Sequence, residues 1–389
     1  MKIFLIARGY PSQQEPTWGC FERDQAEALA KMGHQVIILS VDTRFRSYWR
    51  PLGISKQIIN HVTIYNLFLF PFAILFFLPA SIRERFCSLL FTILAKYAIS
   101  KEGKPDIMCA HYLHFMQHAL HIRKKYHIPL VGIEHWSEMG RDEINHEVIQ
   151  LAQGIYPQID KLITVSTFLK DNIQRYIPLD DIRVVGNLIG SEFYYQPTRS
   201  QHPLTLLSVG RLVEGKRFDL LISALSNIKD VLPQDWQALI IGDGKMKHTL
   251  QQLINELALQ DHVHLLGAKS KSDIIAIMQQ SDLFVLPSAQ ETFGVVYIEA
   301  LACGLPIIAT DCGGPRDIVT PQNGLLIPKS NTAELEKAIL YIVNNLDKYN
   351  RKAIAEDCQM RFSSQVIAQE LTQIFKDTIK TAKNKQLFA

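Results

Sequence analysis

Short apolar runs alternate with amphipathic stretches along most of the chain, which is the pattern of parallel β-strands joined by helical crossovers. The apolar runs of the first half predict strands at 2–7, 35–41, 105–110, 129–134, 161–166 and 183–187. Those of the second half predict strands at 204–210, 238–241, 263–267, 282–287, 306–310 and 324–328. Residues 21–34 have the spacing of a helix that stops at Gly33, a second helix is expected around 220–225, and the chain after Asn331 is expected to be helical.

A polar, proline-bearing stretch at 195–203 separates the two alternating series and predicts a linker. The fold class expected is therefore α/β, with two doubly wound, Rossmann-like domains at 1–195 and 203–364. Ligands of such sheets bind beyond the carboxyl ends of the strands, so function is expected in loops such as 242–244 and 287–291.

Composition agrees with a folded, two-domain protein, because the chain has 389 residues, 47% of them hydrophobic and 20% charged. A net charge of +3 is too small to indicate nucleic-acid binding. The charge is uneven, however, and gives the first domain a basic surface. Between 44 and 125 the only acidic residues are Glu84, Glu102 and Asp106, against Arg or Lys at 44, 46, 50, 56, 83, 85, 96, 101, 104, 123, 124 and 125.

The six cysteines are scattered without a C-x-x-C pair, which favours reduced thiols in a cytoplasmic protein. The apolar run at the amino terminus is too short for a signal peptide and ends in a turn at 9–11. One stretch, 67–80, suggests a membrane. It is too short to span a bilayer and is interrupted by Pro71 and Pro79. Either it is buried in the core, or it is an apolar loop at a membrane surface beside the cations 83, 85 and 96.

Glu291 lies ahead of, and Glu299 lies within, an apolar segment, 295–303, that is expected to form a buried helix. An unpaired buried carboxylate is costly, so Glu299 needs a partner. Phe293-Gly294 precedes the helix, and free N–H groups at its start form an anion site, for which phosphate is the expected occupant. The two carboxylates do not share a face, which excludes a paired-carboxylate hydrolase and favours two contacts along one extended ligand.

The spacing E-x7-E, followed by A-L-A-C-G-L-P-I-I-A-T-D-C-G-G, resembles the signature of the retaining GT4 glycosyltransferases. Further stretches agree in order: G-R-L-V-E-G-K at 210–216, I-G-D-G at 241–244, L-L-G at 265–267, I-E-H-W at 133–136 and, more weakly, V-V-G-N-L-I-G around Asn187. The resemblance implies a GT-B fold with the active site in the cleft between the domains. It also implies that the helix at 365–389 packs back on the first domain, which would bind the acceptor while the second binds the nucleotide sugar.

The resemblance assigns catalytic roles to His135, Glu291, Arg211 and Lys216. It implies that Arg211 and Lys216 hold the donor diphosphate, that Glu291 contacts the donor sugar and that the ribose hydroxyls are the partner of Glu299. The full donor set that it implies is Gly19, Arg211, Lys216, Gly242, Gly244, Leu266, Gly267, Glu291, Thr292, Phe293, Gly294, Val295 and Glu299. No cofactor or metal is expected, in agreement with the absence of a D-x-D motif flanked by apolar residues.

Four histidines, 111, 114, 118 and 121, step by three and four residues and are expected on one stripe of a helix. Such spacing allows zinc binding, but no carboxylate accompanies it, so a helix face at the domain cleft or surface is favoured. His111, at a strand end, is the member most suited to a functional role.

The function expected is transfer of a hexosyl group, with retention, from a UDP- or GDP-linked sugar to a saccharide acceptor. The basic, apolar first domain suggests a lipid-linked acceptor, as in surface polysaccharide or glycolipid synthesis, and a cytoplasmic protein with peripheral contact to the inner face of the membrane. Alternatives are a nucleotide-sugar epimerase of the same fold and a non-catalytic partner subunit. A dinucleotide oxidoreductase is disfavoured, because R-G-Y-P-S follows the first strand in place of G-x-G-x-x-G.

Overall fold

The computed structural model describes residues 1–15, 18–44, 50–69, 79–197 and 203–387, and all counts below refer to these. The chain forms two compact units. Unit 1 consists of Met1–Val165, Lys170–Gly186 and Ser364–Ala389, and unit 2 of Ser166–Leu169 and Asn187–Ser363. The expected linker at 195–203 includes 198–202, which lie outside the described residues.

In the described part of unit 1 an eight-stranded sheet has the order β3-β4-β2-β1-β5-β6-β7-β8. Every neighbouring pair is parallel except β3 and β4. Strands β1, β5 and β6 are buried almost throughout, as expected for parallel strands covered on both faces. The strands are β1 (Lys2–Ile6), β2 (Gln35–Asp42), β3 (Gly53–Ile59), β4 (Val62–Phe68), β5 (Ile107–His111), β6 (Leu130–Glu134), β7 (Lys161–Thr164) and β8 (Ile182–Val184).

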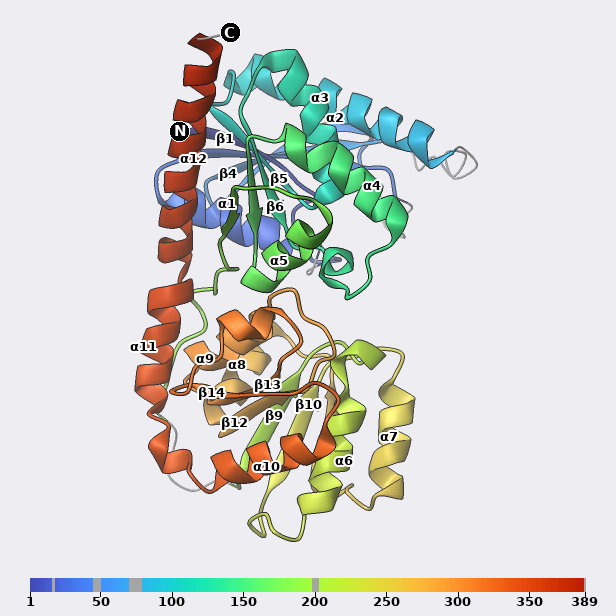
Figure 1. Ribbon diagram of the computed structural model, residues 1–389, viewed down its shortest axis with the longest axis vertical. Coiled ribbons are helices and arrows are strands. Elements are labelled where there is room, and N and C mark those ends of the chain that lie inside the picture. Colours follow the sequence, from blue (N-terminus) through green and yellow to red (C-terminus); the bar gives the residue numbers. More distant parts are fainter. Residues whose placement is uncertain (16–17, 45–49, 70–78, 198–202, 388–389) are drawn as a thin grey trace. The chain divides into compact units, whose positions relative to one another are not determined.

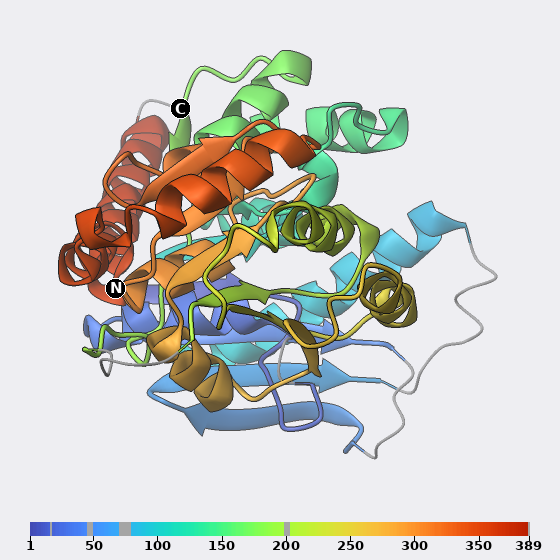
Figure 2. The same ribbon diagram turned by 90° about the horizontal axis from the view of Figure 1, so that it is seen from below.

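The hairpin of β3 and β4 was not foreseen from the sequence. Its two-residue loop, Asn60-His61, has positive φ at both positions (48° and 64°), the geometry of a type I′ turn. A type I′ turn normally has the sequence Asn-Gly, whereas this loop has Asn-His, so the sequence gives only a weak signal for a hairpin. The outer strand, β3, lies at the edge of the sheet (Figure 2) and is mostly exposed.

Helices pack on both faces of this sheet. The long α12 runs beside α1, where His34 Nε2 lies 2.9 Å from Thr372 Oγ1 (Figure 1). Helix α2 lies against α3, with Ser88 Oγ 2.8 Å from His118 Nδ1. The helices are α1 (Cys20–Lys31), α2 (Ala80–Glu102), α3 (Leu113–Tyr126), α4 (His146–Ile155), α5 (Thr167–Tyr176) and α12 (Ser364–Leu387), with short 3₁₀ turns η2 (Ser137–Gly140) and η3 (Tyr156–Gln158).

Unit 2 holds a six-stranded, wholly parallel sheet of order β11-β10-β9-β12-β13-β14 within the described residues. Its strands are β9 (Thr205–Val209), β10 (Gln237–Ile241), β11 (Val263–Gly267), β12 (Leu283–Leu286), β13 (Ile307–Thr310) and β14 (Gly324–Ile327). Its helices are α6 (Phe218–Ile228), α7 (Lys247–Glu256), α8 (Lys271–Gln280), α9 (Val295–Ala302), α10 (Thr332–Val343) and α11 (Arg351–Phe362), with η4 (Glu214–Lys216), η5 (Gly314–Asp317) and η6 (Leu346–Lys348). Because the strands are parallel, the loops that follow them gather at one edge of the sheet.

No helix among the described residues is both long and apolar enough to cross a membrane. Most of the apolar stretch expected at 67–80 (residues 70–78) lies outside the described residues. Its two ends are the last residues of β4 and the start of α2.

Candidate functional site

In unit 2 the loops after β9 and β10 touch at two glycines. A Cβ on Gly242 would lie 1.9 Å from the carbonyl oxygen of Gly210, and one on Gly244 would lie 2.4 Å from that of Leu212. Leu212 N–H also donates to the Asp243 carbonyl at 2.9 Å. No larger residue fits either glycine position, so this contact explains why the G-D-G loop has glycine at both ends.

Lys216 and Glu291 form an ion pair that joins the loop after β9 to the loop after β12. Both are largely shielded from solvent, with exposed side-chain fractions of 22% and 11%. Ser288 Oγ donates to the same carboxylate at 2.8 Å, and the Ala289 N–H donates to the Gly215 carbonyl at 2.9 Å. A fixed cation and a fixed carboxylate therefore stand together at the carboxyl edge of the sheet.

Helix α9 begins directly after this loop. Gly294 is its N-cap with φ 96°, and a Cβ there would lie 2.5 Å from the Tyr297 ring. The helix is not buried all round, which corrects the expectation from its composition. Tyr297, Ile298 and Ala300–Ala302 are buried, whereas Val295, Val296 and Glu299, spaced by three and four residues, are only half-buried. Glu299 thus lies on the least buried face of α9.

The remaining predicted residues of unit 2 are spread along the same edge. The Arg211 side chain is exposed, and no hydrogen bond or ion pair of it is found within the described ranges. Thr292 is held by its backbone, since its carbonyl accepts from Ser166 Oγ at 2.6 Å. Leu266 and Gly267 are the last two residues of the edge strand β11, and the Gly267 carbonyl accepts from the Gly242 N–H at 3.0 Å.

The two predicted residues of unit 1, Gly19 and His135, lie close together at the carboxyl edge of its own sheet. Gly19 is the N-cap of α1 with φ 77°, and a Cβ there would lie 2.2 Å from the Gly9 carbonyl oxygen. His135 follows β6, and its ring stacks on Phe21 of α1 with ring centroids 5.9 Å apart. This pairing ties the start of α1 to the end of β6.

His135 belongs to a buried chain of hydrogen bonds. His111 Nε2 lies 2.9 Å from Gln25 Oε1, and His111 Nδ1 lies 2.9 Å from His135 Nε2. Gln25 Oε1 can only accept, so His111 Nε2 carries its proton. Burial, aided by Arg8, lowers the pKa of His111 to about 3 and keeps it neutral, so its Nδ1 accepts. His135 therefore donates to it through Nε2.

The carboxylate of Glu134 holds the turn that carries His135. It accepts from the N–H groups of His135 (2.9 Å) and Trp136 (2.8 Å) and from the Tyr156 hydroxyl (2.8 Å). Complete burial raises the pKa of Glu134, although these three donors act in the opposite direction. These hydrogen bonds to the Glu134 carboxylate therefore fix the backbone that carries His135.

A third group at this edge was missed by sequence reasoning. Arg8, just after β1, binds the fully buried Glu22 through two hydrogen bonds of 2.8 and 3.0 Å and lies 4.3 Å from the Tyr112 ring centroid. Tyr112 has a positive φ of 63°, an uncommon conformation for a bulky residue and one that gathers at functional sites. The signal available in the sequence was position: Arg8 and Tyr112 each follow a strand directly.

Two family models match the chain in tandem. "Glycosyltransferase Family 4" matches residues 23–193, and "Glycosyl transferases group 1" matches residues 193–356. The chain belongs to the family 4 glycosyltransferases. The resemblance stated from the sequence is therefore confirmed, and glycosyl transfer is the activity of this group.

Two curated relatives show how far the similarity to this glycosyltransferase extends. An uncharacterized glycosyltransferase of Methanocaldococcus jannaschii is 35% identical over 51% of this chain and 53% of its own length. A GDP-mannose-dependent monoacylated α-(1-6)-phosphatidylinositol monomannoside mannosyltransferase of Corynebacterium glutamicum is 30% identical over 43% of this chain and 45% of its own. The match spans about half the length of each relative.

Solved structures confirm the fold. The sucrose-phosphate synthase of Thermosynechococcus elongatus superposes with a TM-score of 0.76 at 20% identity, covering 98% of this chain and all (100%) of the other. Anabaena HepE in complex with UDP-glucose gives a TM-score of 0.71 at 19% identity over 97% of this chain and 100% of HepE. At such identities the likeness shows the GT-B architecture of two parallel-sheet domains, as expected from the sequence.

The histidine stripe of this glycosyltransferase is split, which corrects the expectation of one helix face. His111 ends β5, while 114, 118 and 121 lie on α3. Of these, His118 is buried against α2 and faces Ser88, so it is not a surface residue. Within the described residues no group of three or more His, Cys, Asp or Glu side chains is arranged to hold a metal ion.

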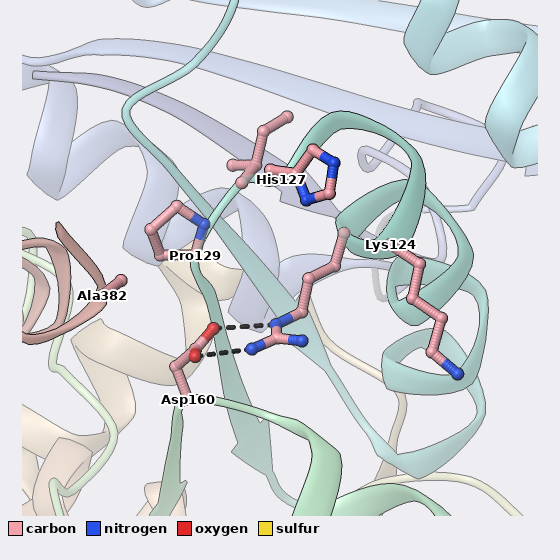
Figure 3. A pocket seen from close by; sticks show the side chains of 7 residues that line it. Lys124, His127, Pro129, Asp160 and Ala382 are labelled. Carbon is pink, nitrogen blue, oxygen red and sulfur yellow. Dashed lines mark hydrogen bonds and ion pairs between the residues drawn. The ribbon is translucent and has the colours of Figure 1, made fainter. Parts of the chain in front are cut away.

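A pocket of about 320 Å³ in unit 1 lies away from these residues (Figure 3). Its lining combines the end of α3 (Lys124, His127) with Pro129 before β6, Asp160 before β7 and Ala382 of α12. It therefore opens at the amino ends of parallel strands, whereas ligands of such sheets bind beyond the carboxyl ends. Asp160 is already bound by Arg123 through hydrogen bonds of 2.9 and 2.7 Å, so the pocket is best explained as a surface depression.

Proposed function

We propose that this glycosyltransferase moves a hexosyl group from a nucleoside diphosphate sugar, with uracil or guanine as the base, to a hydroxyl of a saccharide acceptor, with retention of anomeric configuration. The observation that carries the proposal is the shielded Lys216–Glu291 pair, next to the start of α9 and its half-buried Glu299. A cation, an anion-binding helix start and a carboxylate thus follow one another along a single edge, which matches an extended phosphate-bearing ligand.

In this proposal Lys216 and the exposed Arg211 neutralise the charge that develops on the leaving diphosphate as the bond to the anomeric carbon breaks. The N–H groups at the start of α9, where Gly294 is the N-cap, bind a phosphate oxygen. Glu299 accepts hydrogen bonds from the ribose hydroxyls, and Glu291 contacts the donor sugar. The acceptor oxygen attacks from the face that the diphosphate leaves, and its proton passes to the leaving phosphate. No metal is required in this scheme.

Relatives support the donor class. HepE is described as a complex with UDP-glucose, and the Corynebacterium relative is described as GDP-mannose-dependent. The latter acts on a phosphatidylinositol mannoside, which agrees with a lipid-linked acceptor. We propose that unit 1 binds such an acceptor in surface polysaccharide or glycolipid synthesis, with the protein cytoplasmic and peripheral on the inner face of the membrane. His135 keeps the role that the family resemblance implies, next to the reacting sugar.

The test is calorimetric titration with UDP, GDP, ADP and NAD in EDTA, on the wild type, Glu299→Ala and the control Glu256→Ala. Glu256 is an exposed acid at the end of α7. Micromolar binding of UDP or GDP that only Glu299→Ala weakens, by about tenfold or more, supports the proposal. Equal binding by the wild type and both variants, or no binding, contradicts it.

Product analysis separates the alternatives. A new glycosidic product formed only with a saccharide acceptor supports transfer, and its anomeric configuration by NMR tests retention. Conversion of the donor sugar without acceptor would instead identify an epimerase. Nucleotide binding without any turnover on a donor and acceptor panel would favour a non-catalytic subunit.

A further inference from the structure

The outer face of α2 exposes apolar and cationic side chains in one continuous stripe. The exposed residues of this helix follow one another at helical spacing, so they share a single face. They are Ile82, Arg85, Leu89, Ile93, Lys96, Tyr97, Ser100 and Lys101. We call them the α2 stripe, which from Ile82 to Ser100 extends about 27 Å along the helix.

Large apolar side chains on this stripe are open to solvent. Ile82, Leu89, Ile93 and Tyr97 expose 45, 54, 47 and 39% of their surface. The opposite side of α2 has ordinary core packing, with Ser88, Phe91 and Leu94 buried and Phe91 stacked on His118 at 5.1 Å. The exposed side chains are therefore not the product of a poorly packed helix, and a contiguous apolar face on a soluble surface indicates a partner.

Charge on the stripe is of one sign. Arg85, Lys96 and Lys101 are interspersed with the apolar residues, and the stripe contains no acidic residue. Both acids of α2 lie on the other side of the helix. Glu84 lies 3.6 Å from His118, and Glu102 accepts from Tyr65 at 2.6 Å and from Lys56 at 2.7 Å.

We propose that the α2 stripe binds an anionic lipid surface and holds the enzyme on the membrane. Apolar side chains that enter the interface, with Lys and Arg heads directed to lipid phosphates, are the pattern of a helix lying in the membrane plane. Each cation near such a surface strengthens binding about fivefold. A second copy of this chain fits less well, because pairing the stripe with itself would oppose like charges without a carboxylate to compensate them.

Neighbouring elements continue the basic surface. Helices α2 and α3 both end at the amino edge of the sheet, since the Lys2 side chain donates to the Glu102 carbonyl at the end of α2 and Arg123 near the end of α3 binds Asp160 just before β7. The last turn of α3, with Arg123, Lys124 and Lys125, therefore lies toward the carboxyl-terminal half of α2. The α2 stripe would thus be the surface through which the glycosyltransferase makes the membrane contact of the proposed function. The proposal rests on that function only for the purpose of the contact.

The experiment is flotation of the full chain with vesicles of phosphatidylcholine containing about 30% phosphatidylglycerol, and with phosphatidylcholine alone. We expect binding to the anionic vesicles that weakens with added salt. The double variant Leu89→Ser, Ile93→Ser should bind about tenfold more weakly or worse, as should Arg85→Gln, Lys96→Gln. The matched controls, Val231→Ser with Met360→Ser and Lys269→Gln with Lys348→Gln, replace exposed residues elsewhere and should bind as the wild type does.

Three results would overturn the proposal. The first is that the wild type fails to float with anionic vesicles. The second is that both stripe variants float as well as the wild type, in which case the segment at 67–80 would be the remaining candidate for membrane attachment. The third is a dimer in sedimentation that Leu89→Ser, Ile93→Ser converts to monomer without any vesicle binding. Nucleotide titration of each variant keeps this test separate from the proposed function, because the stripe variants should bind nucleoside diphosphate unchanged.

Discussion

Separating Lys216 from Glu291 gives the sharpest test of the candidate donor site. In Lys216→Met the Glu291 carboxylate keeps only the Ser288 hydroxyl as a side-chain partner among the described residues. Exposed ion pairs contribute about 0–1 kcal/mol, and removing one partner of a buried pair costs about 3–5 kcal/mol. With 22 and 11% of these side chains exposed, we expect unit 2 to lose about 1–3 kcal/mol of unfolding free energy.

Nucleotide binding should respond differently to changes at the two residues. Lys216→Met removes a charge-assisted hydrogen bond to the diphosphate, which is worth about 1.5–3 kcal/mol, so the Kd should rise about tenfold to hundredfold. Glu291→Gln removes the anion that competes for Lys216, so the Kd should stay constant or fall while transfer slows. If the ion pair had a purely structural role, both substitutions would destabilise unit 2 and leave both Kd values unchanged.

The assay combines urea unfolding with calorimetric titration of UDP and GDP on the same preparations. Lys337→Met is the control, because Lys337 pairs with Glu334 on the exposed surface of α10 and should contribute less than about 0.5 kcal/mol. If Glu291→Gln weakened nucleotide binding as much as Lys216→Met, the reasoning that Lys216 exchanges one anion for another would be wrong.

Burial holds the pKa of His111 at about 3, below the ~6.5 of an unfolded histidine. The contribution of the buried, neutral His111 to folding stability is therefore fully present above pH 6.5 and is lost as pH falls toward 3. In His111→Phe the difference in unfolding free energy between pH 7.5 and pH 5 should therefore shrink by about 2 kcal/mol in urea titrations, and an unchanged difference would refute the neutral His111. Gly294→Ala should destabilise unit 2 by at least about 2 kcal/mol in thermal unfolding, since φ is 96° and the Tyr297 ring is fixed by its hydrogen bond to the Leu286 carbonyl. Gly154→Ala, inside α4 with free space around it, should instead stabilise by about 0.5–1 kcal/mol. EDTA should change neither nucleotide binding nor transfer, and a strict Mg²⁺ requirement would contradict the metal-free scheme.

The sequence alone determined the fold class and the family. Apolar runs at fixed spacing marked the strands of both sheets apart from β3, β4 and the hairpin that joins them. Short motifs such as 210–216 and 241–244 marked the loops at the carboxyl edge of unit 2. These features are readable because backbone geometry sets the strand and helix periods, and because a glycine that touches another backbone cannot be replaced.

Only the tertiary structure decided which side chains meet. It paired Lys216 with Glu291 across 75 positions of sequence and placed Glu299 on the least buried face of α9. It also separated the four regularly spaced histidines, with His111 in a buried chain of hydrogen bonds and the other three on α3. It also left the α2 stripe exposed. Partnership and burial depend on what distant segments pack against each residue, and local periodicity carries no record of that packing.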